Sequence, residues 1–413
     1  MILTEGQASR ISPDGLIHDA ERLKELQSLP LERKVGITQA RISEWYNHYN
    51  GNVYVSFSGG KDSTVLLTIA RSLFPDIKAV YVDTGLEYPE VKEFIRTFDN
   101  VEIIRPKMMF RDVITQYGYP LISKEVAECI YYARKHVVSA PPHSIQGKLH
   151  SNCLENDQSE NCRAIGRETF RRIADLLGTR QECGGGLSQF NKTRWLPLAQ
   201  QAPFLISHKC CNIMKKAPAH AYLSQSKCYP ILGTMASESR MRKQSWIRNG
   251  CNGFAAKNPT SQPMAFWTEE DVLRYIKLMD IQIPSVYGEI FPVDYKGRNV
   301  EESGCKICKW ATTGCSRTGC VYCGFGFHNE KHGITRFQSL AQTHPKLYEY
   351  CIGGGQWVDN PYYDPLLPND IDIHLDIGWN PKQIWVPSKT GLGMGKVFDI
   401  CNEIYGEDFC KYK

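Results

Sequence analysis

The chain has 413 residues, of which 42% are apolar and 23% charged, and its formal net charge is +5. These values are typical of globular proteins with two to three domains and exclude collagen-like, coiled-coil and wholly disordered chains. No stretch is apolar over the roughly 18 residues that a membrane span needs, and the small basic excess permits an anionic ligand without requiring nucleic acid.

Cysteine is the unusual residue of this composition. The N-terminal residues MILTEGQASR lack the basic and apolar regions of a secretory signal, so we expect a cytoplasmic protein with no membrane partner. In that reducing compartment the 16 cysteines are not expected to form a disulfide framework. Five of them lie between Cys305 and Cys323, and such clusters are typical of metal or sulfur chemistry.

The first part of the chain predicts a helical cap followed by an α/β sheet. Residues 1–45 are polar and have helical character. After them, short apolar segments alternate with segments of helical periodicity. In chain order these are the strand 52–57, the helix 63–74, the strand 77–83, the helix 89–98 and the strand 100–106. This alternation predicts a parallel sheet with right-handed crossovers.

The middle of the chain differs in composition. Residues 138–200 are rich in Pro, Gly, Ser, Asn and Gln, which predicts a loop-rich insertion interrupted by one helix at 167–177. Beyond it, residues 229–234 predict a further strand, and residues 267–279 predict a helix with Thr268 as its N-cap.

We therefore expect three consecutive regions. The first is the helical cap over 1–45, and the second is an α/β domain over 46–290 that carries the insertion. The third is a cysteine-rich, metal-stabilised region over 291–413, with one helix near 395–405.

A glycine-rich loop joins the strand 52–57 to the following helix. Its two glycines let the backbone approach an anion closely, and the helix N-terminus adds unpaired N–H groups. Hydroxyl groups and one lysine supply further donors. The spacing differs from that of a Walker A loop. The loop consists of Ser58, Gly59, Gly60, Lys61, Asp62 and Ser63.

Two segments carry a family resemblance. SFSGGKDSTVLL at 56–67 resembles the PP-loop of the ATP pyrophosphatases. YVDTGLEYPEV at 81–91 resembles the second motif of the phosphoadenosine-phosphosulfate (PAPS) reductase branch of that superfamily. With the later motifs, the resemblance covers residues 45–330. It implies a parallel-sheet domain of the adenine nucleotide alpha hydrolase-like type.

The resemblance also implies an adenine-nucleotide site. The segment GTMASESRMRKQSWIRNG at 233–250 resembles the G-x-x-x-x-E-S-x-x-R stretch of the family. Lys61, Asp62 and Arg240 are then the expected catalytic residues. The expected nucleotide-binding residues are Ser56, Ser58, Gly59, Gly60, Lys61, Asp62, Ser63, Asp83, Thr84, Gly85, Ser237, Glu238 and Arg240.

The late cysteines have the spacing of a metal site. Cys305 and Cys308 form one C-x-x-C pair, Cys320 and Cys323 form a second, and Cys315 lies between them. Thiolates at this density bind iron–sulfur clusters or structural zinc, and the distance between the two pairs also suits a zinc ribbon.

The family resemblance leaves two ligand sets open. The adenylylsulfate reductases carry a C-C pair and a late G-C-x-x-C that hold a 4Fe-4S cluster, which here implies Cys210 and Cys211 with a late pair. Resemblance to the DNA-phosphorothioation pyrophosphatases implies a second arrangement, in which all four ligands come from one late cysteine-rich segment. That arrangement implies Cys308 or Cys305 with Cys315, Cys320 and Cys323.

Three functions are compatible with these motifs. The first is an ATP- and Mg²⁺-dependent enzyme that adenylates an acceptor for sulfur transfer, with a sulfur donor protein as partner. The second is a reductase of PAPS or adenylylsulfate, and the third is a non-catalytic nucleotide- and metal-binding component of an assembly. The PP-loop is intact and the chain contains no E-C-G-x-H motif, a motif that the reductases need, so the first function is favoured.

The acceptor stays open among tRNA, DNA and a small molecule. A nucleic acid would be contacted by basic residues of the predicted insertion. These are Arg167, Arg171, Arg172, Lys192 and Arg194.

Overall fold

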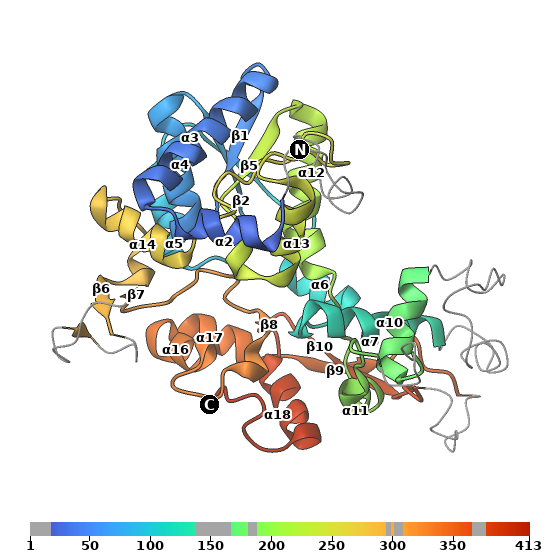
Figure 1. Ribbon diagram of the computed structural model, residues 1–413. Coiled ribbons are helices and arrows are strands. Elements are labelled where there is room, and N and C mark those ends of the chain that lie inside the picture. Colours follow the sequence, from blue (N-terminus) through green and yellow to red (C-terminus); the bar gives the residue numbers. More distant parts are fainter. Residues whose placement is uncertain (1–17, 138–166, 181–187, 295–298, 301–308, 366–376) are drawn as a thin grey trace. The chain divides into compact units, whose positions relative to one another are not determined.

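The computed structural model describes residues 18–137, 167–180, 188–294, 299–300, 309–365 and 377–413 (Figure 1). The chain divides into two compact units, and each is assembled from two stretches of sequence. The first unit comprises Met1–Lys107 and Lys215–Val321, and the second comprises Met108–Met214 and Tyr322–Lys413. This division differs from the three consecutive regions expected from the sequence, whose boundaries stay predictions.

The first unit is built from helices around a central sheet. Its helices are α2 (Ala20–Ser28), α3 (Leu31–His48), α4 (Lys61–Leu73), α5 (Pro89–Ile95), α12 (Ala217–Ser226), α13 (Arg240–Asn249) and α14 (Glu269–Leu278). Its strands are β1 (Val53–Ser56), β2 (Lys78–Val82), β3 (Val101–Ile104), β5 (Tyr229–Leu232), β6 (Ile290–Val293) and β7 (Lys309–Thr312).

Four parallel strands form the central sheet, which confirms the α/β fold expected from the sequence. Their order is β3-β2-β1-β5. The chain proceeds outward from β1 through β2 to β3 and then returns to add β5 on the other side. Ligands of open α/β sheets bind outside the carboxyl ends of the strands at such a reversal. The topology therefore places the candidate site at the ends of β1 and β5.

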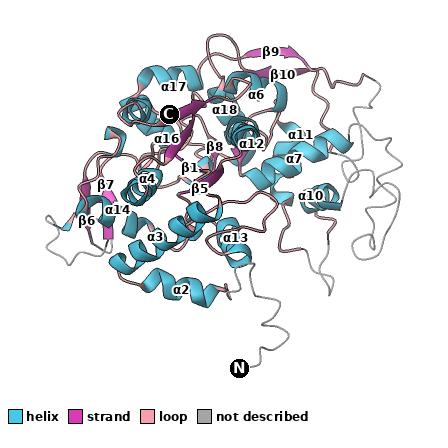
Figure 2. Cartoon of the chain, turned by 90° about the horizontal axis from the view of Figure 1, so that it is seen from above, coloured by secondary structure: helices cyan, strands magenta, loops and turns pink. Residues whose placement is uncertain are grey.

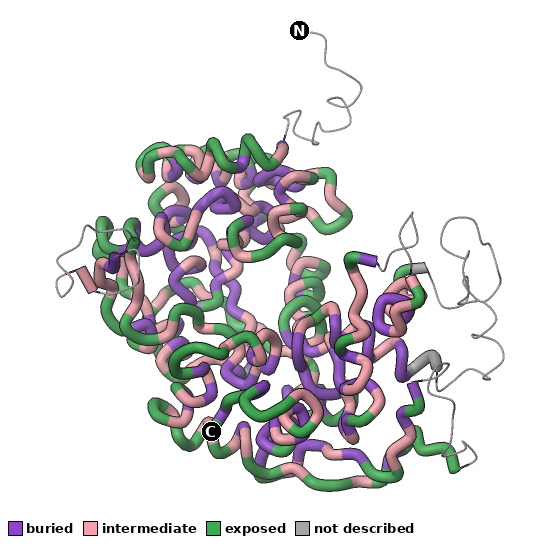
Figure 3. The backbone as a smooth tube through the Cα atoms, turned by 60° about the horizontal axis from the view of Figure 1, so that its bottom comes forward, coloured by how far each residue is buried: buried purple, intermediate pink, exposed green. Residues whose placement is uncertain are grey.

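Alternate residues of the strands face two different layers. Val53 and Val55 belong to the large core that also contains residues of α3 and α4. Tyr54 and Val80 pack with Tyr222 of α12 on the opposite face (Figure 2). Because β1 and β2 are covered on both faces, they are buried along most of their length (Figure 3). This burial explains their nearly continuous apolar sequence.

A buried ion pair fixes the start of α14 against α3. Thr268 is the N-cap of α14, as the sequence predicts, and forms a reciprocal capping box with Asp271. The Asp271 carboxylate also lies 2.6 Å from Nζ of Lys34, whose side chain is 2% exposed. The pair therefore anchors the first turn of α14, which contains Glu269.

The second unit consists mainly of helices. These are α6 (Phe110–Tyr117), α7 (Lys124–Val137), α10 (Arg167–Leu177), α11 (Leu196–Gln201), α16 (Arg336–Thr343), α17 (Pro345–Ile352) and α18 (Met394–Tyr405). Its strands are β4 (Leu121–Ile122), β8 (Gly324–Phe325), β9 (Gln356–Asp359) and β10 (Gln383–Val386). Among the described residues, no helix combines the length and apolar character that a membrane span requires.

A buried arginine organises part of the second unit. The guanidinium group of Arg134 on α7 donates hydrogen bonds to four backbone carbonyls in the segment 198–204. Its Cζ atom lies 4.3 Å from the centre of the Trp379 ring. Arg134 therefore ties α11 and the residues just after it to α7.

The Lys34–Asp271 pair provides a stability test. In Lys34→Met the Asp271 carboxylate stays buried without its cation, which should lower the free energy of unfolding by about 3 kcal/mol. Arg22→Met is the matched control, because Arg22 forms an exposed pair with Glu25 and should lose less than about 1 kcal/mol. Denaturant unfolding of both variants measures the difference. Equal losses would contradict the anchoring role of the buried pair.

Candidate functional site

Two loops meet at the reversal point of the sheet. The loop 58–63 follows β1, and the loop 233–238 follows β5. The strands pair in a register that sets Ser56 opposite Leu232, so both loops leave the same sheet edge. At Gly233 a Cβ atom would lie 3.1 Å from the backbone oxygen of Asp62. Glycine at this position therefore lets the second loop pass close to the first.

The PP-loop adopts the tight conformation that its glycines permit. Gly59 has a φ of +70°, and a Cβ there would lie within 2.8 Å of the side chains of Val91 and Ile95. Gly60 is the N-cap of α4. The Ser58 hydroxyl lies 3.0 Å from the Ser63 hydroxyl and accepts a hydrogen bond of 3.4 Å from the Gly60 N–H. These bonds link the start of the loop to the first turn of the helix.

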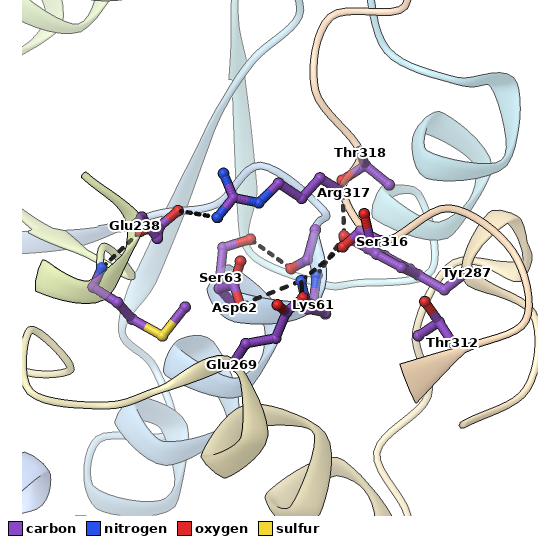
Figure 4. A network of polar contacts seen from close by, with 12 residues as sticks. Lys61, Asp62, Ser63, Glu238, Glu269, Tyr287, Thr312, Ser316, Arg317 and Thr318 are labelled. Carbon is purple, nitrogen blue, oxygen red and sulfur yellow. Dashed lines mark hydrogen bonds and ion pairs between the residues drawn. The ribbon is translucent and has the colours of Figure 1, made fainter. Parts of the chain in front are cut away.

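Lys61 is the first residue of α4, and its side chain is 2% exposed. Its Nζ donates a hydrogen bond of 2.9 Å to the backbone carbonyl of Ser316. The same nitrogen lies 3.2 Å from the carboxylate of Glu269 and 3.8 Å from that of Asp62 (Figure 4). One hydrogen-bonded carbonyl and two carboxylates therefore surround this buried ammonium ion.

The hydroxyl of Tyr287 covers the first turn of α4. It accepts a hydrogen bond of 3.1 Å from the Lys61 N–H and lies 2.9 Å from the hydroxyl of Thr318. Burial raises the pKa of Tyr287 to about 12, so the hydroxyl keeps its proton. A Cβ at Gly60 would lie 2.9 Å from the Thr318 hydroxyl. The segment 316–318 thus lies directly on the PP-loop.

Asp62 faces the same network with an incompletely bonded carboxylate. Burial raises the pKa of Asp62, and the ammonium charge of Lys61 opposes that rise. The Oδ1 atom is buried and makes no hydrogen bond. A buried carboxylate oxygen in this state suits a hard cation such as Mg²⁺.

Glu238 holds two arginines at the second loop. Its carboxylate accepts a hydrogen bond of 2.8 Å from the Met235 N–H and pairs with Arg242 of α13. Arg317 lies 3.9 Å from the other carboxylate oxygen (Figure 4). Glu238 therefore lies between two guanidinium groups from distant parts of the sequence, and its closer partner is Arg242.

Two other residues expected at this site lie outside that network. Ser237 is exposed, and its hydroxyl donates a hydrogen bond of 3.4 Å to the Trp267 carbonyl. Arg240, the first residue of α13, is exposed as well. Arg242 is the arginine of this helix that pairs with Glu238, and the catalytic role of Arg240 stays a prediction.

The second motif follows β2 and forms an ordered turn. The Asp83 carboxylate accepts a hydrogen bond of 3.2 Å from the Gly85 N–H. It lies 3.2 Å from Nε of Arg105 and 3.3 Å from Nζ of Lys92. Partial burial raises the pKa of Asp83, but the contacts with Arg105 and Lys92 outweigh it and leave the pKa below its ordinary value.

The remainder of this turn contacts the late part of the chain. The Thr84 hydroxyl donates a hydrogen bond of 2.6 Å to Glu87. Two residues after Thr84, the Leu86 carbonyl accepts a hydrogen bond of 2.9 Å from the Val321 N–H. The segment 316–321 therefore contacts both the PP-loop and the second motif.

A family model matches the two parts of the chain that carry these loops. It is the model of the phosphoadenosine phosphosulfate reductase domain, and it matches residues 52–114 and 188–324. These residues belong to the phosphoadenosine phosphosulfate reductase family. The match covers the PP-loop, the second motif, the loop after β5 and the last C-x-x-C pair.

Comparisons with individual proteins give shorter or weaker matches. Two uncharacterized proteins of Methanocaldococcus jannaschii are 34% and 36% identical over 95 and 84 residues, which are 22% and 19% of this chain. The matched segments span only 23% and 18% of those relatives. A solved phosphoadenylyl-sulfate reductase from Candida auris, in complex with phosphate, aligns with 71% of this chain and 96% of its own. The TM-score is 0.30 and the identity 11%.

The candidate metal ligands are distributed over both units. Cys315 and Cys320 are half-buried in the first unit. Cys323 is half-buried in the second unit. Burial raises the pKa of Cys315 to about 11, so its thiol is protonated in this arrangement.

The earlier C-C pair also belongs to the second unit. Cys210 is buried and Cys211 is half-buried, and their sulfur atoms lie 3.9 Å apart. Cys305 and Cys308 lie outside the described residues. Within the described ranges, no three His, Cys, Asp or Glu side chains are arranged to hold a metal ion.

The basic residues of the predicted insertion are mostly paired with acids. Arg171 lies 3.1 Å from Glu168 of its own helix. Arg172 lies 3.0 Å from Glu125 of α7, which is also 3.8 Å from Lys192. These ion pairs reduce the positive charge that this segment presents to a nucleic acid. Arg194 instead stacks 5.1 Å from the Trp195 ring centre, and the side chain of Arg167 is not described.

Several residues of the network were not expected from the sequence. Tyr287 and Glu269 carry no motif, and the contact of Ser316 uses only its backbone carbonyl. Arg317 had one available signal, because it is a lone arginine in a segment otherwise rich in cysteine and glycine.

The PP-loop glycines permit a matched comparison. Gly59 and Gly85 both have a positive φ, of +70° and +76°, but a Cβ at Gly85 would contact nothing within 4 Å. Gly59→Ala should therefore lower the free energy of unfolding by about 1–3 kcal/mol more than Gly85→Ala, because only its methyl group overpacks the contact with α5. Denaturant unfolding measures both. Equal losses of stability in the two variants would show that glycine is needed at position 59 only for its positive φ.

Proposed function

We propose that this PAPS reductase-family protein is an ATP pyrophosphatase-type enzyme that adenylates an acceptor for sulfur transfer. The observation that supports this most directly is the intact SGGKDS loop at the start of α4, with Lys61 buried among oxygen acceptors. Helix N-termini with free backbone N–H groups and a nearby cation bind phosphate. The loop also occupies the sheet edge where α/β proteins bind their ligands.

The bonding around Lys61 is suited to exchange with phosphate. The ammonium group contacts the Ser316 carbonyl, and the backbone N–H contacts the Tyr287 hydroxyl. Both partners are neutral oxygen acceptors. Phosphate oxygens carry negative charge and form hydrogen bonds about twice as strong as neutral ones. A triphosphate would therefore replace these two acceptors at the loop.

Mg²⁺ would be held by Asp62 together with phosphate oxygens. The Oδ1 atom of Asp62 is buried, makes no hydrogen bond, and lies at the loop itself. Magnesium bound by one or two carboxylates and by substrate phosphates is a common arrangement. When bound, the ion would neutralise phosphate charge. It would also offset the carboxylates of Glu238 and Glu269, which otherwise oppose an anion here.

The proposed reaction has two displacement steps. An acceptor oxygen attacks the α-phosphorus of ATP, the bond from that phosphorus to pyrophosphate breaks, and the acceptor proton passes to solvent. A sulfur nucleophile from a donor protein then displaces AMP from the adenylated acceptor. Lys61 would stabilise the charge that develops on pyrophosphate in the first step, and catalysis would rest on positioning and charge stabilisation.

The late cysteines are proposed to bind a 4Fe-4S cluster, with zinc as the alternative. This proposal rests on the spacing of the cysteine pairs. Cys320 and Cys323 belong to both ligand sets implied by the family resemblance. No step of the adenylation is assigned to the cluster.

A nucleotide turnover assay tests the adenylation. Anaerobically purified protein should convert α-labelled ATP to AMP and pyrophosphate in the presence of its acceptor. Lys61→Ala should reduce this conversion by about 100-fold or more, because it removes the cation from the phosphate site. Lys78→Ala is the control, since Lys78 forms an exposed pair with Glu102 on β2 and β3.

The same preparation distinguishes the reductase function. If PAPS or adenylylsulfate with a thiol yields sulfite, and no acceptor mixture yields AMP from ATP, the protein is a reductase and the adenylation proposal is wrong. Unchanged ATP turnover in Lys61→Ala would instead show that the reaction does not take place at the PP-loop.

Metal analysis tests the cluster. We expect iron and acid-labile sulfide in equal amounts, about four of each per chain, and loss of both in Cys320→Ser and Cys323→Ser. Cys228→Ser should retain them, because Cys228 is a half-buried residue next to β5. Stoichiometric zinc without iron would replace the cluster by a structural zinc site.

A further inference from the structure

Three consecutive residues between Cys315 and Cys320 lie at the phosphate loop. The carbonyl of Ser316 accepts the bond from Lys61 Nζ, and the hydroxyl of Thr318 lies against Tyr287 at the start of α4. Arg317 is between them, and its side chain extends toward Glu238 (Figure 4). The backbone of this segment is thus fixed at the PP-loop on both sides of the arginine.

Arg317 is held only weakly by its ion-pair partner, Glu238. Its guanidinium lies 3.9 Å from Glu238, at the outer limit of an ion pair, and 61% of the side chain is exposed. Exposed pairs of this kind contribute little to stability. Glu238 keeps its other contacts with Arg242 and the Met235 N–H when Arg317 leaves. The arginine can therefore move without leaving a buried charge unpaired.

We propose that Arg317 is a phosphate-binding residue, which the cysteine-flanked segment 315–320 delivers to the PP-loop and for which Glu238 is the resting partner. The inference rests on the proposed nucleotide site and adds to it a phosphate-binding side chain from a different part of the chain. Its target is a polyphosphate bound at the loop 58–63.

The chemistry of the guanidinium group favours this exchange. Its planar N–H fork matches two phosphate oxygens at once, and each such bond is charge-assisted. A polyphosphate carries more negative charge than the single carboxylate of Glu238. When a phosphate takes the place of the Ser316 carbonyl on Lys61, the segment loses one contact with the loop. Arg317 would restore that contact through the phosphate itself.

This arrangement would connect the cysteines to the nucleotide. Arg317 is two residues after Cys315 and three before Cys320. A segment that binds phosphate through Arg317 would keep both thiols next to the bound nucleotide. Ordering of the cysteine segment and affinity for phosphate should then depend on each other.

Equilibrium binding tests the assignment. The full chain is titrated calorimetrically with α,β-methylene ATP and Mg²⁺, and separately with pyrophosphate, at two salt concentrations. Arg317→Ala should weaken both affinities by about tenfold or more and reduce the salt dependence, because a charge-assisted contact is lost. Arg317→Lys should fall between it and the wild type. Arg274→Ala, at an exposed arginine of α14, should bind like the wild type.

The outcomes separate this inference from the proposed function. Wild-type affinity in Arg317→Ala, with binding lost in Lys61→Ala, would overturn the inference and leave the nucleotide site standing. A wild-type protein that binds neither ligand would overturn both. Thermal melting checks folding: we expect Arg317→Ala to melt with the wild type. If it does not, Arg317→Gln carries the test, and wild-type affinity in that variant together with an unchanged salt dependence would count against a phosphate contact.

Discussion

The site is organised around the buried ammonium group of Lys61. A charge in this position is stable only if oxygen atoms surround it, since an unpaired buried charge is very costly. The acceptors come from three separate parts of the chain, namely the PP-loop, the first turn of α14 and the segment that contains Ser316. These parts must therefore fold together at the reversal point of the sheet. A phosphate bound at the loop would offer Lys61 a charged acceptor in place of the neutral Ser316 carbonyl.

The sheet and the PP-loop could be predicted from the sequence because their signals are local. The strands β1, β2 and β3 and the helices between them follow from apolar periodicity within short segments. The capping box of α14 also lies within four residues, and Thr268 was expected as its N-cap. Glycine at position 59 is required by its positive φ and by the close contact with α5. The conformation of the loop can therefore be inferred from the motif.

The cover over the PP-loop could not be predicted, because its contacts join residues more than 200 positions apart. Tyr287 belongs to no motif, and Ser316 acts through a backbone carbonyl that any residue possesses. In the segment 315–320 only the cysteines form a recognisable pattern, and no motif indicates a role for the residues between them. The choice between Arg240 and Arg242 also depends on which side of α13 faces Glu238, and a cluster of basic residues in the sequence does not reveal this.

We propose that the loop 58–63 binds the phosphates of an adenine nucleotide in place of the protein's own acceptors. The most direct measurement is a crystal structure with α,β-methylene ATP and Mg²⁺. We expect phosphate oxygens on the N–H groups of the loop and on Lys61 Nζ, with the Ser316 carbonyl displaced. A nucleotide bound elsewhere, with the Lys61–Ser316 hydrogen bond retained, would contradict it.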